Sequence, residues 1–202
     1  LLLLSYFAAT LSAQEETRLL RFPATHGDRV VFTYAGDLYT VPATGGVARR
    51  LTGDAGFEMF AHFSPDGKSI AFTGQYDGNT EVYLIPADGG IPKRLTVTAT
   101  LGRDEVSDRM GPNNIVMAWK GTEVVYRSRQ REFNDFKGQL FSVPASGGPS
   151  TQLPLPRGGW CSFNGDGSKM AYNRVFREFR TWKRYRGGQA DDIWIYDFAA
   201  KT

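Results

Sequence analysis

The sequence predicts an all-β protein, and more specifically a β-propeller of four-stranded antiparallel blades. The first observation is a repeated segment, which reads GDLYTVPATGGVARRLT from Gly36, TEVYLIPADGGIPKRLT from Thr80 and GQLFSVPASGGPSTQLP from Gly138. The second is the spacing of these copies, which is near the roughly 40 to 50 residues that one propeller blade occupies. The third is composition, because 23 Gly and 10 Pro in 202 residues favour turns over long helices.

Each copy of the repeat predicts two strands and the turn between them. In the first copy, an alternating strand should end at Pro42, because proline cannot donate to a strand ladder. The glycine pair from Gly45 supplies the positive φ that a hairpin turn needs, and a short outer strand should end at Leu51. The other two copies repeat this order.

A second hairpin precedes each copy, which brings the count to four strands per blade. It is clearest in MFAHFSPDGKSIAFTG, where Pro65 presets a turn and Gly67 takes its left-handed position. We predict blades over residues 18–56, 57–102, 111–156 and 157–202. The last copy, DDIWIYDFAAKT, stops before an outer strand. We therefore expect residues 14–202 to form an incomplete β-propeller domain of about four blades.

The first residues, LLLLSYFAATLSA, combine an apolar run with small residues. This pattern predicts the remnant of a secretory signal peptide over residues 1–13, and hence a periplasmic or secreted protein. The run is too short to span a membrane. A buried first strand is the alternative interpretation.

The predicted loops between second and third strands grow along the chain, from AG at Ala35 to SRQREFNDFKG at Ser128 and the long segment from Asn173. In an up-and-down blade these loops emerge on one face of the propeller. The opposite face has only tight turns such as SPDGK. Because long loops cost conformational entropy, this rim is the predicted functional surface.

The last of these loops contains REFRTWKRYRGG, residues 177–188, in which basic and aromatic residues alternate. Arginine donors at a rim suit carboxylates or a neighbouring domain, whereas the aromatics suit packing of the loop onto the blades. The net charge of +3 is confined mainly to this tract, so we do not expect a nucleic-acid partner. The candidate binding residues here are Arg180, Trp182, Lys183, Arg184, Tyr185 and Arg186.

We find no motif of a catalytic centre in the sequence. There is no GxSxG elbow, no HExxH and no phosphate-binding glycine loop. His26, His62 and the single Cys161 are expected to be structural, and no metal site or cofactor is predicted. The chain by itself is therefore not expected to catalyse a reaction.

Two stretches, HGDRVVFTYAGDLYTVP and NRVFREFRTWKRYRGGQADDIWIYDF, resemble the amino-terminal propeller of the tricorn protease family, especially its secreted bacterial members. The likeness runs from Phe22 to Thr202. The SPDGK turn is also shared with TolB-type propellers, whereas the run from Trp182 to Gly188 is more particular. In that family a six-bladed propeller precedes a seven-bladed one, a PDZ domain and a serine-peptidase region. The resemblance therefore implies that this chain is about four blades of a six-bladed propeller.

The resemblance implies a propeller that guides peptides or unfolded protein segments toward a catalytic region outside this chain. Its other partners would be the remaining blades and domains of the parent protein, which would be a homo-oligomer. A basic pair in the family's propeller holds the carboxyl end of the substrate, and the matching stretch GRDEVSDRM offers Arg103 or Arg109, which are not adjacent. The alternative is a TolB-like periplasmic propeller that binds proteins without catalysis.

Overall fold

All regular elements in the part of the chain that the structure describes are β-strands. The computed structural model describes residues 19–99, 111–132, 137–175, 184, 186, 187, 190 and 192–202. Within these residues the strands form four antiparallel sheets, so the predicted fold class is confirmed. No helix in the described part is long and apolar enough to cross a membrane. The predicted signal remnant, residues 1–13, lies outside the described residues.

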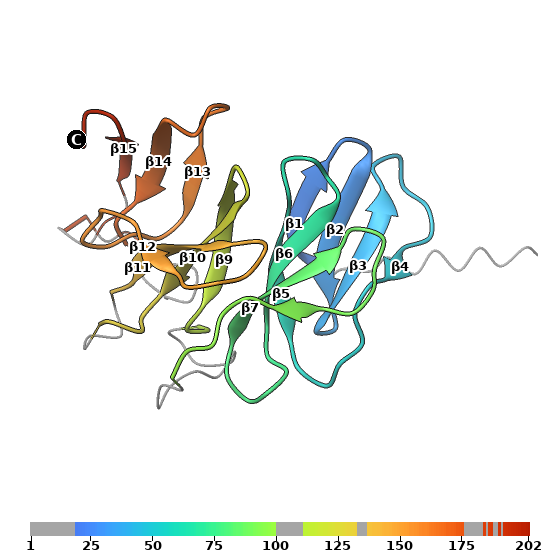
Figure 1. Cartoon of the computed structure of the whole chain (residues 1–202). Coiled ribbons are helices and arrows are strands. Elements are labelled where there is room, and N and C mark those ends of the chain that lie inside the picture. The colour runs from blue at the N-terminus through green and yellow to red at the C-terminus, as the bar shows by residue number, and fades with distance from the viewer. Residues whose placement is uncertain are drawn as a thin grey trace, which may run out of the picture.

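The first two sheets each have four strands in sequential order (Figure 1). Blade 1 consists of β1 (Arg21–His26), β2 (Arg29–Tyr34), β3 (Asp37–Pro42) and β4 (Arg49–Arg50). Blade 2 consists of β5 (Glu58–Phe63), β6 (Ser69–Gly74), β7 (Glu81–Pro86) and β8 (Lys93–Arg94). The outer strands thus end one residue before Leu51 and Leu95, the predicted last residues.

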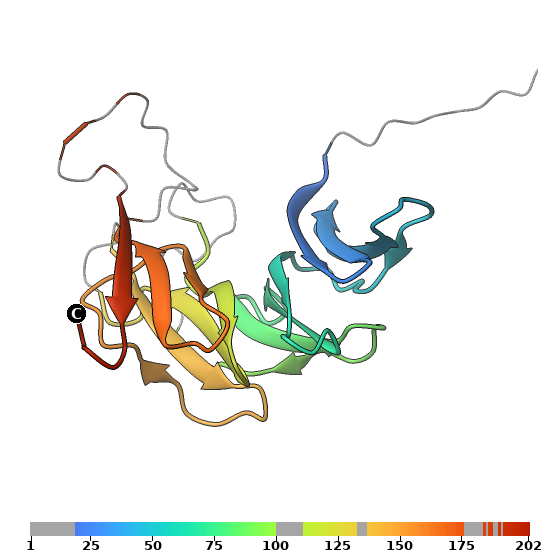
Figure 2. The same ribbon diagram turned by 90° about the horizontal axis from the view of Figure 1, so that it is seen from above.

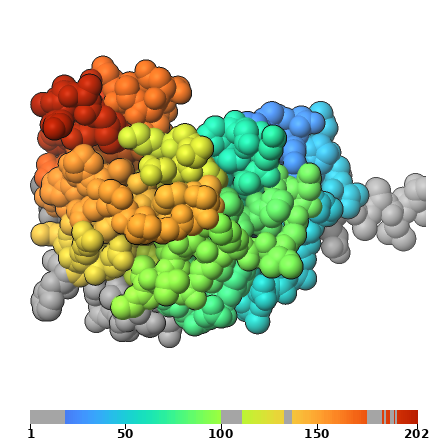
Figure 3. Space-filling view, viewed as in Figure 1, coloured from blue at the N-terminus to red at the C-terminus, as the bar shows by residue number. Residues whose placement is uncertain are grey.

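The third sheet repeats this pattern and the fourth has three strands. Blade 3 consists of β9 (Ile115–Lys120), β10 (Glu123–Ser128), β11 (Gln139–Pro144) and β12 (Thr151–Gln152). Blade 4 consists of β13 (Cys161–Phe163), β14 (Lys169–Asn173) and β15 (Ile193–Asp197). Figure 3 shows the blades following one another in chain order across the molecule, from blue to red.

The first strand of each blade is the inner strand. Strand β5 lies against β1 on one side and against β9 on the other, and β9 in turn lies against β13. The view from above shows blade 1 and blade 4 at opposite ends of the arrangement (Figure 2). The four inner strands therefore surround the axis of the propeller, with the second and third strands farther out.

The turns have the backbone that the sequence predicts. In blade 2, Gly67 has a φ of 68°, and the Asp66 carboxylate accepts hydrogen bonds from the Ser64 hydroxyl (2.6 Å) and the Lys68 amide (3.1 Å). Gly89, in the turn after β7, has a φ of 87°. A side chain would be strained at both glycines, because L-residues rarely adopt positive φ.

Neighbouring blades pack an aromatic face against an aliphatic face. In blade 2, the rings of Phe72 and Tyr83 stack with their centroids 5.8 Å apart, and they lie in one buried core with Val31 and Leu38 of blade 1. Blade 3 repeats this with its stacked pair Tyr126 and Phe141 (5.7 Å) against the aliphatic face of blade 2. Blade 2 therefore contributes both its faces to the hydrophobic core.

A buried acid joins blade 1 to blade 2. The Glu58 side chain is fully buried at the start of β5, and its Oε2 atom accepts a hydrogen bond from the Thr52 hydroxyl (2.8 Å). Thr52 also accepts the Leu38 amide (2.8 Å), so the contact bridges the two blades. Burial raises the pKa of Glu58 to about 7, although hydrogen bonds from Thr52 and Tyr76 oppose the shift.

Replacement of a buried isoleucine should show how much the packing between blades contributes to stability. Ile70→Ala removes a side chain that is 0 % exposed in the core between blades 1 and 2. We expect the free energy of unfolding to fall by about 2 to 5 kcal/mol in urea titrations followed by circular dichroism. The matched control Ile91→Ala, at a residue 91 % exposed, should change it by less than about 0.5 kcal/mol. Equal effects would contradict the packing described.

The Glu58 carboxyl should make stability depend on pH. Its pKa is raised from 4.5 to about 7 in the folded chain, so its stabilising contribution is fully present below pH 4.5 and is lost as the pH rises through about 7. The free energy of unfolding should fall by on the order of 2 kcal/mol between pH 5 and 8, and Glu58→Gln should remove this fall.

The matched control for Glu58→Gln is Asp28→Asn, which replaces an exposed acid of blade 1. Its stability should depend on pH as that of the unmodified chain does. A slope that survives unchanged in Glu58→Gln would show that other groups cause the pH dependence.

Candidate functional site

The long loops leave the blades at one rim, as the loop lengths predict. The connections between second and third strands, residues 35–36, 75–80, 129–138 and 174–192, all begin where the second strand of a blade ends. The first-to-second turns at the opposite rim are short, as between His26 and Arg29 or between Lys120 and Glu123. We call the first surface the loop rim.

The structure describes only two of the residues predicted to bind a substrate or partner. Arg184 and Arg186 are both exposed, and Arg184 has a left-handed backbone with a φ of 56°. The other six lie outside the described residues: Arg103, Arg109, Arg180, Trp182, Lys183 and Tyr185. Their arrangement as a binding site therefore stays a prediction.

In blade 1, an acid, an arginine and a threonine interact at the loop rim and stabilise it. Arg50 forms an ion pair with Asp37 (2.8 Å) across the third and fourth strands. Its Nε atom donates to the carbonyl oxygen of Thr52 (2.7 Å), which places the Thr52 hydroxyl between Leu38 and Glu58. This arrangement fixes the end of blade 1 against the start of blade 2.

Blade 2 has the same arrangement around a fully buried acid, Glu81, at the start of β7. Its carboxylate accepts hydrogen bonds from five neighbouring residues: Asn79 (2.9 Å), Arg94 (3.0 Å), Thr96 (2.5 Å), Thr98 (2.7 Å from the amide) and Asn114 (3.0 Å). A buried carboxylate is tolerated only when it is paired in this way. The network therefore holds the loop bases at 79 and 98 and the start of blade 3 in one geometry.

Sequence reasoning missed this network, although the repeat contains a signal for it. An acid opens the third strand in DLY and EVY, at Asp37 and Glu81, and an arginine precedes Leu-Thr in RRLT and KRLT. The third copy has Gln139 and Gln152 at the equivalent positions. The acid and the arginine are both replaced in the third copy. This joint replacement could have indicated that the two side chains contact each other.

Two fully buried arginines lie at the base of the third loop. Arg127 is 2 % and Arg129 is 1 % exposed, and Arg129 donates to the carbonyl oxygen of Gly111 (3.1 Å). A Cβ on Gly138 would lie 2.4 Å from Arg127 Nε, so this glycine leaves room for the guanidinium. The base of the loop 129–138 therefore holds two buried guanidinium groups, which the sequence analysis did not single out.

His62 and Cys161, which lie in two of the inner strands, have shifted pKa values. Burial lowers the pKa of His62 in β5 to about 4 and raises that of Cys161 in β13 to about 12. At neutral pH, His62 is therefore uncharged and Cys161 is a protonated thiol, so neither is primed to transfer a proton or to attack a substrate. Among the described residues, no three His, Cys, Asp or Glu side chains cluster as metal ligands would.

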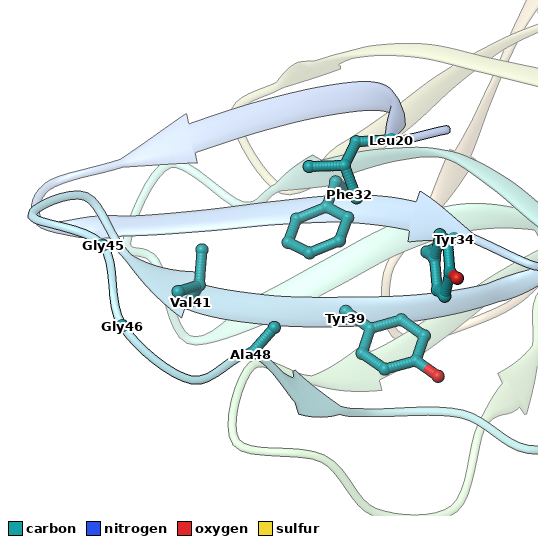
Figure 4. Close-up of a pocket in the computed structure, with 8 residues that line it drawn as sticks. All are labelled: Leu20, Phe32, Tyr34, Tyr39, Val41, Gly45, Gly46 and Ala48. Carbon is teal, nitrogen blue, oxygen red and sulfur yellow. The ribbon is translucent and has the colours of Figure 1, made fainter. Parts of the chain in front are cut away.

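An apolar pocket of about 340 Å³ lies on the outer face of blade 1 (Figure 4). Its lining includes Phe32, Tyr39 and Val41, with Leu20 above them. Phe32 and Tyr39 stack with centroids 6.0 Å apart, as the equivalent pairs of blades 2 and 3 do. The pocket thus has the chemistry of a face that packs against another blade.

Comparison with known families identifies the repeat. Residues 17–202 match the family described as the tricorn protease N-terminal beta propeller domain. Tricorn protease homolog 1 of Streptomyces coelicolor is 34 % identical over 177 residues, which cover 87 % of this chain and 16 % of that protein. Tricorn protease of Thermoplasma acidophilum is 27 % identical over 191 residues, again 16 % of its length. The chain thus spans about a sixth of these relatives.

Solved structures agree with this assignment. The crystal structure of the tricorn protease matches 91 % of this chain and 18 % of its own, with a TM-score of 0.73 and 25 % identity. The putative TolB of Agrobacterium tumefaciens matches 91 % of this chain and 60 % of its own, with a TM-score of 0.65 and 19 % identity, a likeness of fold alone. The repeated blades, the loop rim and these matches together show that the chain belongs to the family of tricorn protease N-terminal β-propeller domains.

Proposed function

We propose that this chain is the propeller of a tricorn-like serine peptidase, and that it guides peptides toward a catalytic region formed by other parts of the parent protein. The match to the tricorn family over residues 17–202 carries this proposal, together with relatives that are named as proteases. The TolB-like alternative rests on fold alone, because that likeness is 19 % identical.

The loop rim supplies the chemistry for this role. Arg184 and Arg186 are exposed there, Arg131 is exposed in the neighbouring loop, and Arg127 lies buried at the base of that loop. Arginine donates several hydrogen bonds to a carboxylate, which every free peptide has at its end. The buried network around Glu81 fixes the start of blade 3 against blade 2 beneath this rim.

The rim arginines can be tested with peptides that differ only at the carboxyl end. The triple variant Lys183→Gln, Arg184→Gln and Arg186→Gln of the chain should bind a free-acid peptide about tenfold more weakly, because charge-assisted hydrogen bonds are lost. Binding of the amidated peptide should change little. Fluorescence anisotropy with both labelled peptides measures the two affinities.

A matched control removes three lysines at the opposite rim, Lys68, Lys169 and Lys201, which are also exposed. It lowers the net charge equally and should leave both affinities unchanged. If the control and the rim variant weakened peptide binding equally, the effect would be due to net charge alone. Tight oligonucleotide binding that weakens steeply with salt would instead indicate a nucleic-acid surface.

A further inference from the structure

The rim opposite the loop rim contains two adjoining cavities at blades 2, 3 and 4. One, of about 370 Å³, lies between the first-to-second turns of blades 2 and 3. The other, of about 530 Å³, lies between those of blades 3 and 4. Pro65, Trp119, Gly121 and Thr122 line both cavities. The two therefore form one surface depression, which we call the turn groove.

The turn groove follows from the lengths of three turns. The turn of blade 3 consists of residues 121–122, whereas those of blades 2 and 4 consist of residues 64–68 and 164–168. The short turn therefore forms the floor between two longer turns, which form the walls. Each wall contains an Asp-Gly pair, at Asp66 and at Asp166. Hydrogen bonds from a nearby serine hydroxyl and a backbone amide lower the pKa of both carboxyls, so both are charged at neutral pH.

An aromatic ring lies in the floor in a fixed orientation. Trp119 is half-buried, and its Nε1 atom donates a hydrogen bond to the carbonyl oxygen of His62 in blade 2 (3.0 Å). The indole ring also packs against the buried core between blades 2 and 3. Because two contacts hold the ring, the part that lines the groove is a preformed stacking surface. Indole binds cations over its face more strongly than the other aromatic side chains do.

Acidic side chains outnumber basic ones in the turn groove, although the whole chain has a net charge of +3. Asp66, Glu123 and Asp166 line it, and Lys120 is the one basic residue among its described lining. The Lys120 ammonium already lies 3.7 Å from the centroid of the Phe198 ring. Glu123 forms no ion pair with any residue that the structure describes. The groove therefore favours a cationic ligand.

Arginine fits these features better than lysine or a metal ion does. Its planar guanidinium can stack on the indole ring while it donates several hydrogen bonds to carboxylates beside the ring. Lysine offers a point charge without a planar face. A metal ion needs several ligand atoms that converge, and no three acidic, histidine or cysteine side chains cluster in this way in the described part of the chain. Because the groove spans three turns, it suits an extended segment with more than one such side chain.

We propose that the turn groove is a docking site for an extended, arginine-containing segment of another polypeptide. One guanidinium stacks on Trp119 in the part of the groove that the two cavities share. Neighbouring arginines of the segment pair with Asp66 on one wall and with Asp166 on the other. This inference is independent of the proposed function, because it concerns the opposite rim and the cationic side chains of a ligand instead of its carboxyl end.

Peptides with blocked ends test the docking site without a carboxylate for the loop rim. The probe is a short, labelled, acetylated and amidated peptide in which Arg alternates with Ser, and its partner probes have Lys or the uncharged citrulline in place of Arg. The 202-residue chain should bind the Arg peptide about tenfold more tightly than the Lys peptide, because lysine lacks the planar stack. The citrulline peptide should bind weakly. Fluorescence anisotropy measures the three affinities.

Removal of the groove charges should weaken binding of the Arg peptide. The triple variant Asp66→Asn, Glu123→Gln and Asp166→Asn should bind it about tenfold more weakly, because charge-assisted hydrogen bonds are lost. Asparagine retains an oxygen that can accept the hydrogen bonds of each wall turn. The matched control neutralises three exposed acids outside the groove and should bind as the unmodified chain does. Its substitutions are Asp28→Asn, Asp54→Asn and Asp192→Asn.

Replacement of the indole tests the stacking contact. In Trp119→Leu, the preference for the Arg peptide over the Lys peptide should fall to about twofold or less, because the aromatic face is lost. The control Trp160→Leu replaces another half-buried indole, outside the groove, and should keep the preference. If circular dichroism shows that either leucine variant is unfolded, the pair Trp119→Phe and Trp160→Phe replaces them, with a smaller loss expected at Trp119.

Three outcomes would overturn the docking site. Equal weakening in the triple groove variant and its control would attribute the binding to overall charge. Equal affinity of the unmodified chain for the Arg and Lys peptides would remove the specificity for arginine. Failure of the unmodified chain to bind the Arg peptide would remove the site itself. None of these results bears on the proposed function, which is tested separately with carboxyl ends at the loop rim.

Discussion

The rest of the structure depends on one interaction between blades. In it, a stacked pair of aromatic rings from one blade packs against the aliphatic face of the preceding blade. A four-stranded sheet with two apolar faces is unstable alone, because both faces must leave water. Phe72 and Tyr83 are covered by Leu38 of blade 1, and the same relation recurs one blade later. The equivalent pair in blade 1, Phe32 and Tyr39, lines the open pocket and shows what such a face looks like without a blade upon it.

This packing leaves only the rims and the axis for polar chemistry and for ligands. At the loop rim, Glu81 is buried, yet it accepts hydrogen bonds from Arg94 of the neighbouring strand β8, from Thr96 just after that strand and from Asn114, which directly precedes the first strand of blade 3. Such a network lets the loops beyond it differ in length while the blades beneath keep their geometry. Arg127, in β10, and Arg129, which follows its end, lie buried at the same rim.

The axis is governed by another constraint, because every inner strand presents an edge that its own sheet does not pair. The bulges at Phe22 and Phe60 interrupt these strands and direct aromatic rings into the space between them.

Much of the fold was predictable from the sequence, because strand ends and turns depend on residues close together in the chain. Pro42 marks the end of a strand and Gly45 marks a turn. The repetition of these two signals along the chain predicted the blades. The pairing of Asp37 with Arg50 could also have been predicted from the repeat. The contact of Phe60 with Trp160 could not, since those residues are distant in sequence and meet only because the blades turn about a common axis. Residues close together in the sequence therefore determined the blades and their turns. The tertiary structure decided the environment of the buried acids, the loop base and the contact of Phe60 with Trp160, because it alone sets the distances between blades.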